Sequence, residues 1–285
     1  MASAGEGAAI SPTMQFEGGR KSPFFLLGSR LALKWPGGVT HTFNWAAGVK
    51  REPLFNIPPV VVALLALLAL IHVVRTFLLS DDQDVAFLLS FAFIPARYDA
   101  SVVLDGPLPG GFAAEIWTFV TYSLIHADWT HFGVNAIWLL PFGSAVARRF
   151  GALRFVAFFI VTAAAGAALH LATHAGEQFP MIGASAAISG TMAAAMRFAF
   201  ERGGPLSLLR EAGDEAYRVP ALPLTHVLRD GRVLIFLAVW FGINIIFGVG
   251  SLSFTGNDQP VAWQAHIGGF LAGLLLFSWF DPAPP

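Results

Sequence analysis

The chain has 285 residues, of which 55% are hydrophobic and only 12% are charged, with a net charge of −1 and a mean hydropathy of +0.64. Soluble domains carry about 25% charged residues, so this composition indicates a membrane protein. The sequence has no basic arm or stripe, which argues against a nucleic-acid partner. The absence of cysteine excludes disulfides, thiol catalysis and cysteine-ligated metals.

The N-terminal part of the chain has no continuous apolar run of the kind found in a cleaved signal peptide, because Arg30 and Lys34 interrupt it. We therefore expect residues 1–55 to form a loosely ordered cytosolic tail. Residues 56–281 are expected to form one membrane domain, and residues 282–285 a short C-terminal tail.

Apolar segments within this domain are close to the roughly 20 residues that a helix needs to cross a hydrocarbon core of about 30 Å. They predict an all-α, polytopic bundle of six transmembrane helices. The segments are 58–79, 129–147, 154–173, 181–200, 233–250 and 261–280.

The distribution of basic residues predicts the orientation of the bundle. With the N-terminus in the cytoplasm, only Arg75 and Arg97 of the 17 lysines and arginines lie outside, in agreement with the positive-inside rule. The external stretch 80–128 is then the longest connection, and long connections of this kind usually have a function. Its apolar pieces are too short to span and are expected in the interface, which His72 and Arg75 should also reach.

Ser185 lies among small residues near the start of the fourth segment, with Gly183 two positions before it and Ala186 directly after it. A serine hydroxyl is a weak nucleophile at neutral pH unless a base accepts its proton. The serine alone is ambiguous, because small residues are also common where membrane helices pack closely.

A histidine in the sixth segment is a candidate for that base. His266 shares a helix face with Gly269 and Gly273, whose G-x-x-x-G spacing lets two helix backbones approach closely. A histidine within a membrane is costly unless it has polar partners, so it is a functional candidate, although a hydrogen bond to a neighbouring helix is the alternative. The fourth and sixth segments offer no carboxylate within reach, and we expect a Ser185–His266 dyad.

His131 and Asn135 are four residues apart in the second segment and project from one helix face. The second, fourth and sixth segments all run inwards from the outer surface. At roughly 1.5 Å per residue, both side chains therefore lie in the same shallow layer as Ser185 and His266. We interpret Asn135 and His131 as donors to the oxyanion of an acyl transfer, the alternative for Asn135 being a bond between helices. Asp128 is expected to cap this helix.

These motifs resemble the rhomboid family of intramembrane serine proteases. That family carries its serine in Gly-x-Ser-Gly, its base in Ala-His-x-x-Gly and a further His…His-x-x-x-Asn motif. The matching residues here are Gly183-Ala-Ser185-Ala186, Ala265-His266-Ile-Gly-Gly269 and His126…His131-Phe-Gly-Val-Asn135. Three positions depart from the family pattern: Ala186 replaces a glycine, Ser189 replaces an aromatic residue that stacks on the histidine, and Trp117-Thr118 replaces a Trp-Arg pair.

The resemblance implies a bacterial-type rhomboid that hydrolyses a peptide bond in or beside a transmembrane segment of another protein. It implies a bacterial inner membrane, with an organelle membrane as the alternative, and transmembrane protein substrates and the lipid bilayer as partners. The distribution of basic residues predicts that both termini lie in the cytoplasm. No cofactor is expected, and the oligomeric state is open. His126 is expected to support the external loop or a water, and the loop 251–260 to cap the site.

Three further observations bear on other functions. His170, His174 and Glu177 have the spacing of metal ligands but lack a convincing fourth partner, so no metal is expected. A rhomboid-like protein that binds membrane clients without cutting them is the main alternative to an enzyme. A transporter has less support, because the segments show no repeat and the polar layer is shallow.

Overall fold

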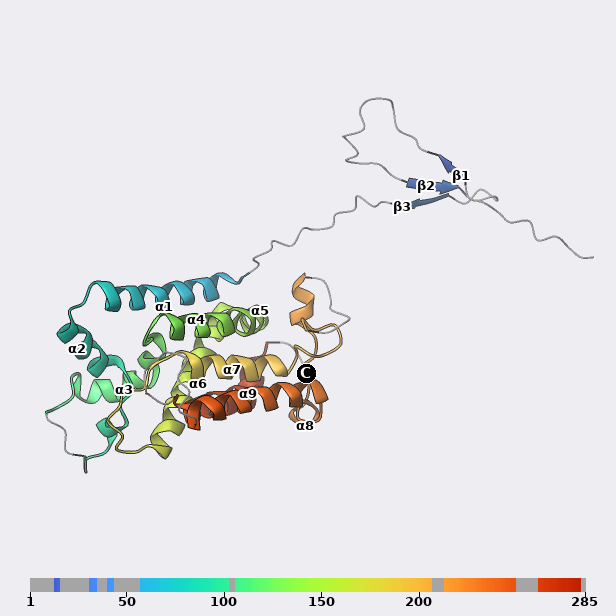
Figure 1. Ribbon diagram of the computed structural model, residues 1–285. Coiled ribbons are helices and arrows are strands. Elements are labelled where there is room, and N and C mark those ends of the chain that lie inside the picture. The colour runs from blue at the N-terminus through green and yellow to red at the C-terminus, as the bar shows by residue number, and fades with distance from the viewer. Residues whose placement is uncertain are drawn as a thin grey trace, which may run out of the picture. The chain divides into compact units, whose positions relative to one another are not determined.

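The computed structural model describes residues 13–15, 31–34, 40–43, 57–102, 106–206, 213–249 and 261–282 (Figure 1). The chain divides into two units, Met1–Asn56 and Ile57–Pro285. The rest of the predicted N-terminal tail and the predicted capping loop 251–260 lie outside the described residues.

The first unit contains a small antiparallel sheet that the sequence analysis did not predict. Its strands are β1 (Thr13–Gln15), β2 (Leu31–Lys34) and β3 (Thr40–Phe43), in the order β1-β2-β3. Strands of three or four residues are too short for a period-of-two pattern to stand out from the surrounding sequence.

The second unit is all-α among its described residues, as predicted, apart from one isolated bridge between Phe93 and Met181. Short 3₁₀ turns occur at Pro95–Tyr98, Tyr122–Leu124 and Gly213–Tyr217. Its α-helices are α1 (Pro59–Phe77), α2 (Asp81–Phe91), α3 (Gly111–Thr121), α4 (Trp129–Trp138), α5 (Ser144–Phe150), α6 (Ala152–Thr173), α7 (Ser185–Met196), α8 (Leu224–Val227), α9 (Gly231–Val249) and α10 (Trp263–Phe280).

Apolar character is clearest in two of these helices. Among the described residues, α1 and α6 are long and apolar enough to cross a membrane, whereas α7 and the Gly231–Ile246 part of α9 are shorter apolar helices. In two of the other predicted segments, 129–147 and 181–200, a wide turn and a late helix start shorten the regular α-helix.

The second predicted segment is helical throughout but contains a wide turn. A π-helical turn, η3 (Leu139–Gly143), joins α4 to α5 and includes Pro141. Proline has no N–H to donate and its ring pushes against the carbonyl of the preceding turn, and a wider turn accommodates both effects. The break lies one turn beyond Asn135, so α4 remains regular where it carries the candidate polar residues.

The fourth predicted segment begins its helix four residues later than expected. Residues 181–184 are not helical, and Gly183 has φ +121°. Met181 instead pairs with Phe93 of the external stretch through two backbone hydrogen bonds of 2.8 and 3.1 Å. The prediction that Ser185 lies a full turn inside the helix was therefore wrong: Ser185 is the first residue of α7.

Helices α6, α7 and α10 pack against one another at the centre of this unit (Figure 1). A Cβ atom at Gly269 would collide with the backbone carbonyl of Ala186, and one at Gly273 with that of Gly190. At Gly166 it would lie 2.6 Å from the Ala186 methyl. The close approach that the G-x-x-x-G spacing predicted is present, and it aligns the N-terminal ends of α7 and α10.

The expectation that His72 and Arg75 reach the membrane interface was wrong. Both side chains are buried, with 2% and 8% of their surface exposed. Arg75 forms an ion pair of 2.7 Å with Asp84 of α2 and donates a 2.8 Å hydrogen bond to the backbone carbonyl of His126. The chain turns back after α1, so that Asp84 and the segment before α4 supply partners that the sequence pattern did not reveal.

Candidate active site

The segment that leads into Ser185 depends on a glycine. The N–H of Gly183 donates to the carbonyl of Tyr122 at 3.0 Å, and its positive φ is a conformation that residues with a side chain rarely adopt. A Cβ at this position would also lie only 2.7 Å from His131 Nε2. Gly183 therefore brings the imidazole of His131 against the chain directly before Ser185.

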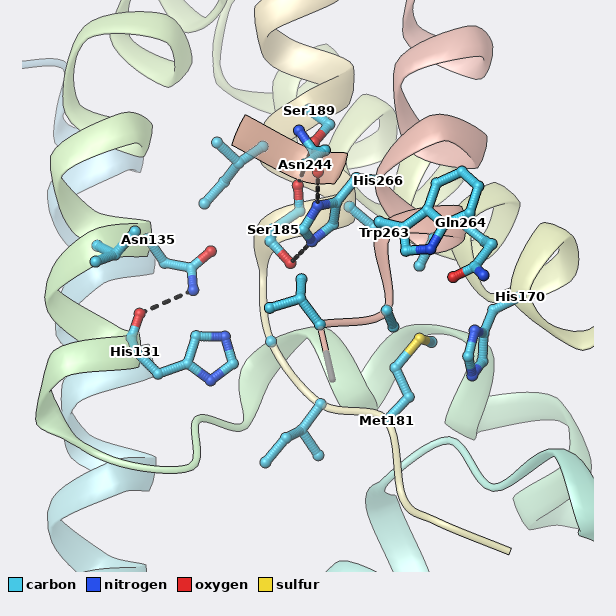
Figure 2. A pocket seen from close by; sticks show the side chains of 18 of the residues that line it. His131, Asn135, His170, Met181, Ser185, Ser189, Asn244, Trp263, Gln264 and His266 are labelled. Atoms are coloured by element: carbon cyan, nitrogen blue, oxygen red, sulfur yellow. Dashed lines mark hydrogen bonds between the residues drawn. The ribbon is translucent and has the colours of Figure 1, made fainter. Parts of the chain in front are cut away.

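Ser185 and His266 lie in contact. Ser185 Oγ is 2.7 Å from His266 Nε2, although the two residues are 81 positions apart in the chain (Figure 2). Ser185 begins α7 and His266 is in the first turn of α10, and the glycine contacts between these helices hold both ends at one level. The geometry is that of a hydroxyl nucleophile and a base within direct proton-transfer distance.

A third side chain, which the sequence analysis missed, bonds the other ring nitrogen of His266. Asn244 of α9 places its Oδ1 2.5 Å from His266 Nδ1, at the opposite side of the ring from Ser185 (Figure 2). The signal for it was present, because a polar amide inside a strongly apolar segment is itself a functional candidate. The dyad was predicted because the fourth and sixth segments offer no carboxylate, whereas Asn244 is an amide in the fifth segment.

Asn135 and His131 face the same space from α4 (Figure 2). Asp128 caps this helix as predicted, accepting the His131 backbone N–H at 2.8 Å. The Asn135 amide nitrogen donates to the His131 carbonyl at 2.9 Å and carries a second N–H. His131 Nδ1 accepts the backbone N–H of Ala127 at 3.4 Å, so the ring proton resides on Nε2, the atom that faces Gly183.

A cavity of about 750 Å³ connects these groups. Ser185, His266, His131 and Asn135 all line it, and Trp240 is among the apolar residues of its wall. Cavities of about 300–1,000 Å³ are the usual size for ligand sites in proteins. The space is large enough for several residues of an extended peptide together with water.

His126, the histidine that was expected to support the site, lies next to His131. His126 is buried, and its ring meets that of His131 edge-on with 5.2 Å between ring centres. Neither ring nitrogen of His126 has a hydrogen-bond partner among the described residues. His126 therefore lies beside the polar cluster without contacting Ser185 or His266 in any described interaction.

The positions that depart from the family pattern have other partners. The Ala186 methyl lies toward Gly166 of α6, and the Ser189 hydroxyl donates to the Ser185 carbonyl at 2.7 Å. In the external stretch, the Trp117 indole N–H donates to the Ser90 carbonyl at 2.9 Å. The Thr118 hydroxyl, which is fully buried, donates to the Ala114 carbonyl at 2.6 Å.

The fold and the site together define a polytopic helical membrane protein with a paired serine hydroxyl and imidazole beside a cavity. A family model for the rhomboid domain matches residues 113–281, more than half of the chain. The chain therefore belongs to the rhomboid family, which is membrane-embedded and whose members are generally intramembrane serine proteases. Helices α1 and α2 precede the matched region. No curated protein matches the chain.

Proposed function

We propose that this protein is an active intramembrane serine endopeptidase that hydrolyses a peptide bond in or beside a transmembrane segment of another membrane protein. The observation that carries the proposal is the 2.7 Å distance between Ser185 Oγ and His266 Nε2 at the edge of the cavity. Family membership alone does not distinguish an enzyme from a relative that has lost activity, whereas this contact is what acyl transfer requires.

The reaction follows from the positions of these two side chains. Ser185 Oγ attacks the substrate carbonyl carbon while His266 Nε2 takes the hydroxyl proton. The C–N bond then breaks, and His266 returns that proton to the leaving amine. A water molecule, deprotonated by His266, hydrolyses the resulting ester and regenerates the serine.

Three donors are proposed to stabilise the oxyanion. Ser185 is the first residue of α7, so its backbone N–H has no partner within the helix and lies at the positive end of the helix dipole. The other two proposed donors are on α4 and face the cavity: the second N–H of the Asn135 amide and the Nε2–H of His131. In comparable enzymes, removing one such donor raises the activation barrier by about 2.7–4 kcal/mol.

The substrate class follows from the cavity and its surroundings. Large apolar side chains on α1 and α9 are exposed, as expected of surfaces that face lipid, for example Leu70 at 59% and Ile235 at 68%. A substrate helix entering from lipid must unwind to expose a peptide bond, so we propose transmembrane proteins with helix-destabilising residues at the cut. We further propose the predicted orientation, with the site near the outer surface of a bacterial inner membrane.

The test uses the purified full-length protein in detergent and in proteoliposomes. A fluorophosphonate probe should label the parent, and the parent should cut single-span model substrates. Both signals should disappear in Ser185→Ala and His266→Ala. Thr191→Val is the matched control for the serine, because its hydroxyl bonds only the Ile188 carbonyl of the same helix among described contacts. His226→Ala, at an exposed position, is the control for the histidine.

The same experiment tests the alternative. A folded parent that is neither labelled nor able to cut any of the substrates, but that retains them on a column in detergent, would identify a client-binding protein and overturn the proposal.

A further inference from the structure

Asn244 makes two hydrogen bonds that fix the orientation of its amide. Its Nδ2 donates to the Trp240 carbonyl one turn earlier in α9 at 2.8 Å. A carbonyl can only accept, so the amide oxygen must point the other way, toward His266 Nδ1. The side chain is buried, with 6% of its surface exposed.

This orientation determines which nitrogen of His266 carries the proton. The Asn244 oxygen accepts, so Nδ1 must donate and Nε2 is left with a lone pair directed at the Ser185 hydroxyl. That tautomer is the only neutral form in which His266 can accept the serine proton. The opposite tautomer would place two acceptors together at Nδ1 and a proton against Ser185.

The family pattern explains why such a restraint is needed here. The aromatic residue expected to stack on the histidine is Ser189, whose hydroxyl bonds the Ser185 carbonyl. No described ring contact holds the His266 imidazole, whereas Asn244 reaches it from a helix that the predicted dyad did not include. A neutral amide also restrains the ring without placing a carboxylate in the membrane, which would be costly.

We propose that Asn244 is a positioning residue that holds His266 in the catalytic tautomer and ring orientation, in place of the stacked aromatic. This inference rests on the proposed protease activity. It assigns α9 a role in catalysis in addition to lining the cavity.

The test compares Asn244→Leu with Asn244→Asp in the full-length protein. The leucine variant keeps the side-chain size but removes the acceptor, and kcat should fall by about 10²-fold with little change in KM. The aspartate variant keeps an acceptor and should retain most of the activity.

A purely structural role predicts a different pattern. Asn244→Leu would then lower the unfolding temperature but leave kcat per folded molecule unchanged, and that result overturns the inference. If Asn244→Leu does not fold, Asn244→Ala, which also removes the acceptor, replaces it in the comparison. Loss of cleavage in Ser185→Ala with full activity in Asn244→Leu would refute the positioning role and leave the protease proposal intact.

A second, independent observation concerns the outer end of α6. His170 and His174 are one turn apart there, Glu177 follows, and one ligand atom from each lies within 4.8 Å of the others. His170 Nε2 is 3.6 Å from the Glu177 carboxylate, and His170 Nδ1 is buried without a hydrogen-bond partner among the described residues.

The fourth ligand that the sequence spacing lacked comes from α10. The Gln264 side-chain amide lies 3.3 Å from His174 Nε2, on the same side of the cavity as His170 (Figure 2). Half a turn of the amide group presents its oxygen at that position. Two imidazoles and a carboxylate are the three protein ligands of several zinc sites, and the fourth position there is open to a further oxygen.

The geometry points to a Zn²⁺ site made by His170, His174, Glu177 and Gln264 at the edge of the cavity. The rings of His170 and His174 are stacked with 4.7 Å between centres, and one nitrogen of each lies within 4.8 Å of the other. Gln264 is two residues before His266, so a bound ion links the end of α6 to the turn that carries the proposed base.

Binding is measured without reference to proteolysis, on the Ser185→Ala protein purified without a histidine tag and treated with chelator. Calorimetry should give one Zn²⁺ per chain, and Co²⁺ should produce the visible absorption of a tetrahedral site. His174→Ala and Glu177→Gln should each weaken binding at least about 10-fold, whereas the exposed His226→Ala should not. Equal binding in His174→Ala and His226→Ala, or no stoichiometric binding by the parent, would overturn the site.

Discussion

The two ends of the α7–α10 helix pair treat polar side chains in opposite ways. At the end that carries Ser185 and His266, the side chains of Ser185, His266 and Asn244 bond one another and line a cavity. At the other end, Arg149 donates to both carboxylate oxygens of Asp281 at 2.8 and 2.9 Å and to the carbonyls of Tyr217 and Val219. At the cavity end, polar side chains face an open space. At the Arg149 end, the polar side chain connects helices and loops through hydrogen bonds.

The glycine contacts between the two ends make this division possible. They hold the α7 and α10 backbones at a fixed separation, so the polar residues at the cavity do not have to stabilise the fold. We call the contacts of Gly269 and Gly273 with the α7 backbone the seam. The comparison predicts that substitutions at the seam and at Arg149 lower the stability of the fold, whereas substitutions at the cavity lower the cleavage rate. Four substitutions test this division, from the largest expected effect to the smallest.

The seam should be the least tolerant region. Gly269→Ala places a methyl group against the Ala186 carbonyl, a backbone atom that cannot rotate away, so the cost should exceed the usual 1–3 kcal/mol of overpacking. We expect loss of folded protein, measured by size-exclusion chromatography and thermal unfolding in detergent. Gly242→Ala on α9, where a Cβ meets nothing within 4 Å, is the matched control and should fold normally. If Gly269→Ala folds as well as Gly242→Ala, the glycine contacts do not set the separation of α7 and α10.

Arg149→Met should lower the free energy of unfolding by about 3–5 kcal/mol, because it leaves the carboxylate of Asp281 buried without this partner. The cleavage rate per folded molecule should be unchanged. Denaturant unfolding in detergent and a single-span substrate assay measure the two quantities. Arg229→Met, at an exposed position, is the control. A fall in rate with unchanged stability would show that the ends are not separate.

Asn135→Ala should have the reverse effect. We expect kcat to fall by about 10²–10³-fold, equivalent to about 2.7–4 kcal/mol, with KM nearly unchanged, because the amide acts on the oxyanion and not on the bound substrate. The unfolding temperature should change little, since the described bond of Asn135 is to a carbonyl of its own helix. A large loss of stability with normal kcat would assign Asn135 to helix packing.

Ala186→Gly should have the smallest effect. The substitution restores the glycine of the family motif and removes a methyl that lies toward Gly166, so stability should fall by about 1 kcal/mol through the lower helix propensity of glycine. The cleavage rate should stay near that of the parent. A tenfold faster variant would show that this methyl narrows the site.

The parts of the site that the sequence predicted are those with short local motifs. Ser185, His266, His131 and Asn135 belong to local patterns, and helix periodicity was sufficient to place each of them on a helix face. The structure brings Ser185 and His266 into contact and lines one cavity with all four.

The parts that the sequence did not predict depend on contacts between distant segments. The late start of α7 is set by the pairing of Met181 with Phe93, and the burial of Arg75 by the position of Asp84. Asn244 and Gln264 become partners of histidines only once α9 and α10 are packed. No local pattern in the chain records these pairings.

The bridge between Phe93 and Met181 has a consequence for the position of Ser185. Met181 is four residues before Ser185, and its two backbone bonds join the start of α7 to the stretch between α2 and α3. Displacement of that stretch would therefore move the serine hydroxyl relative to His266 without any contact inside the cavity.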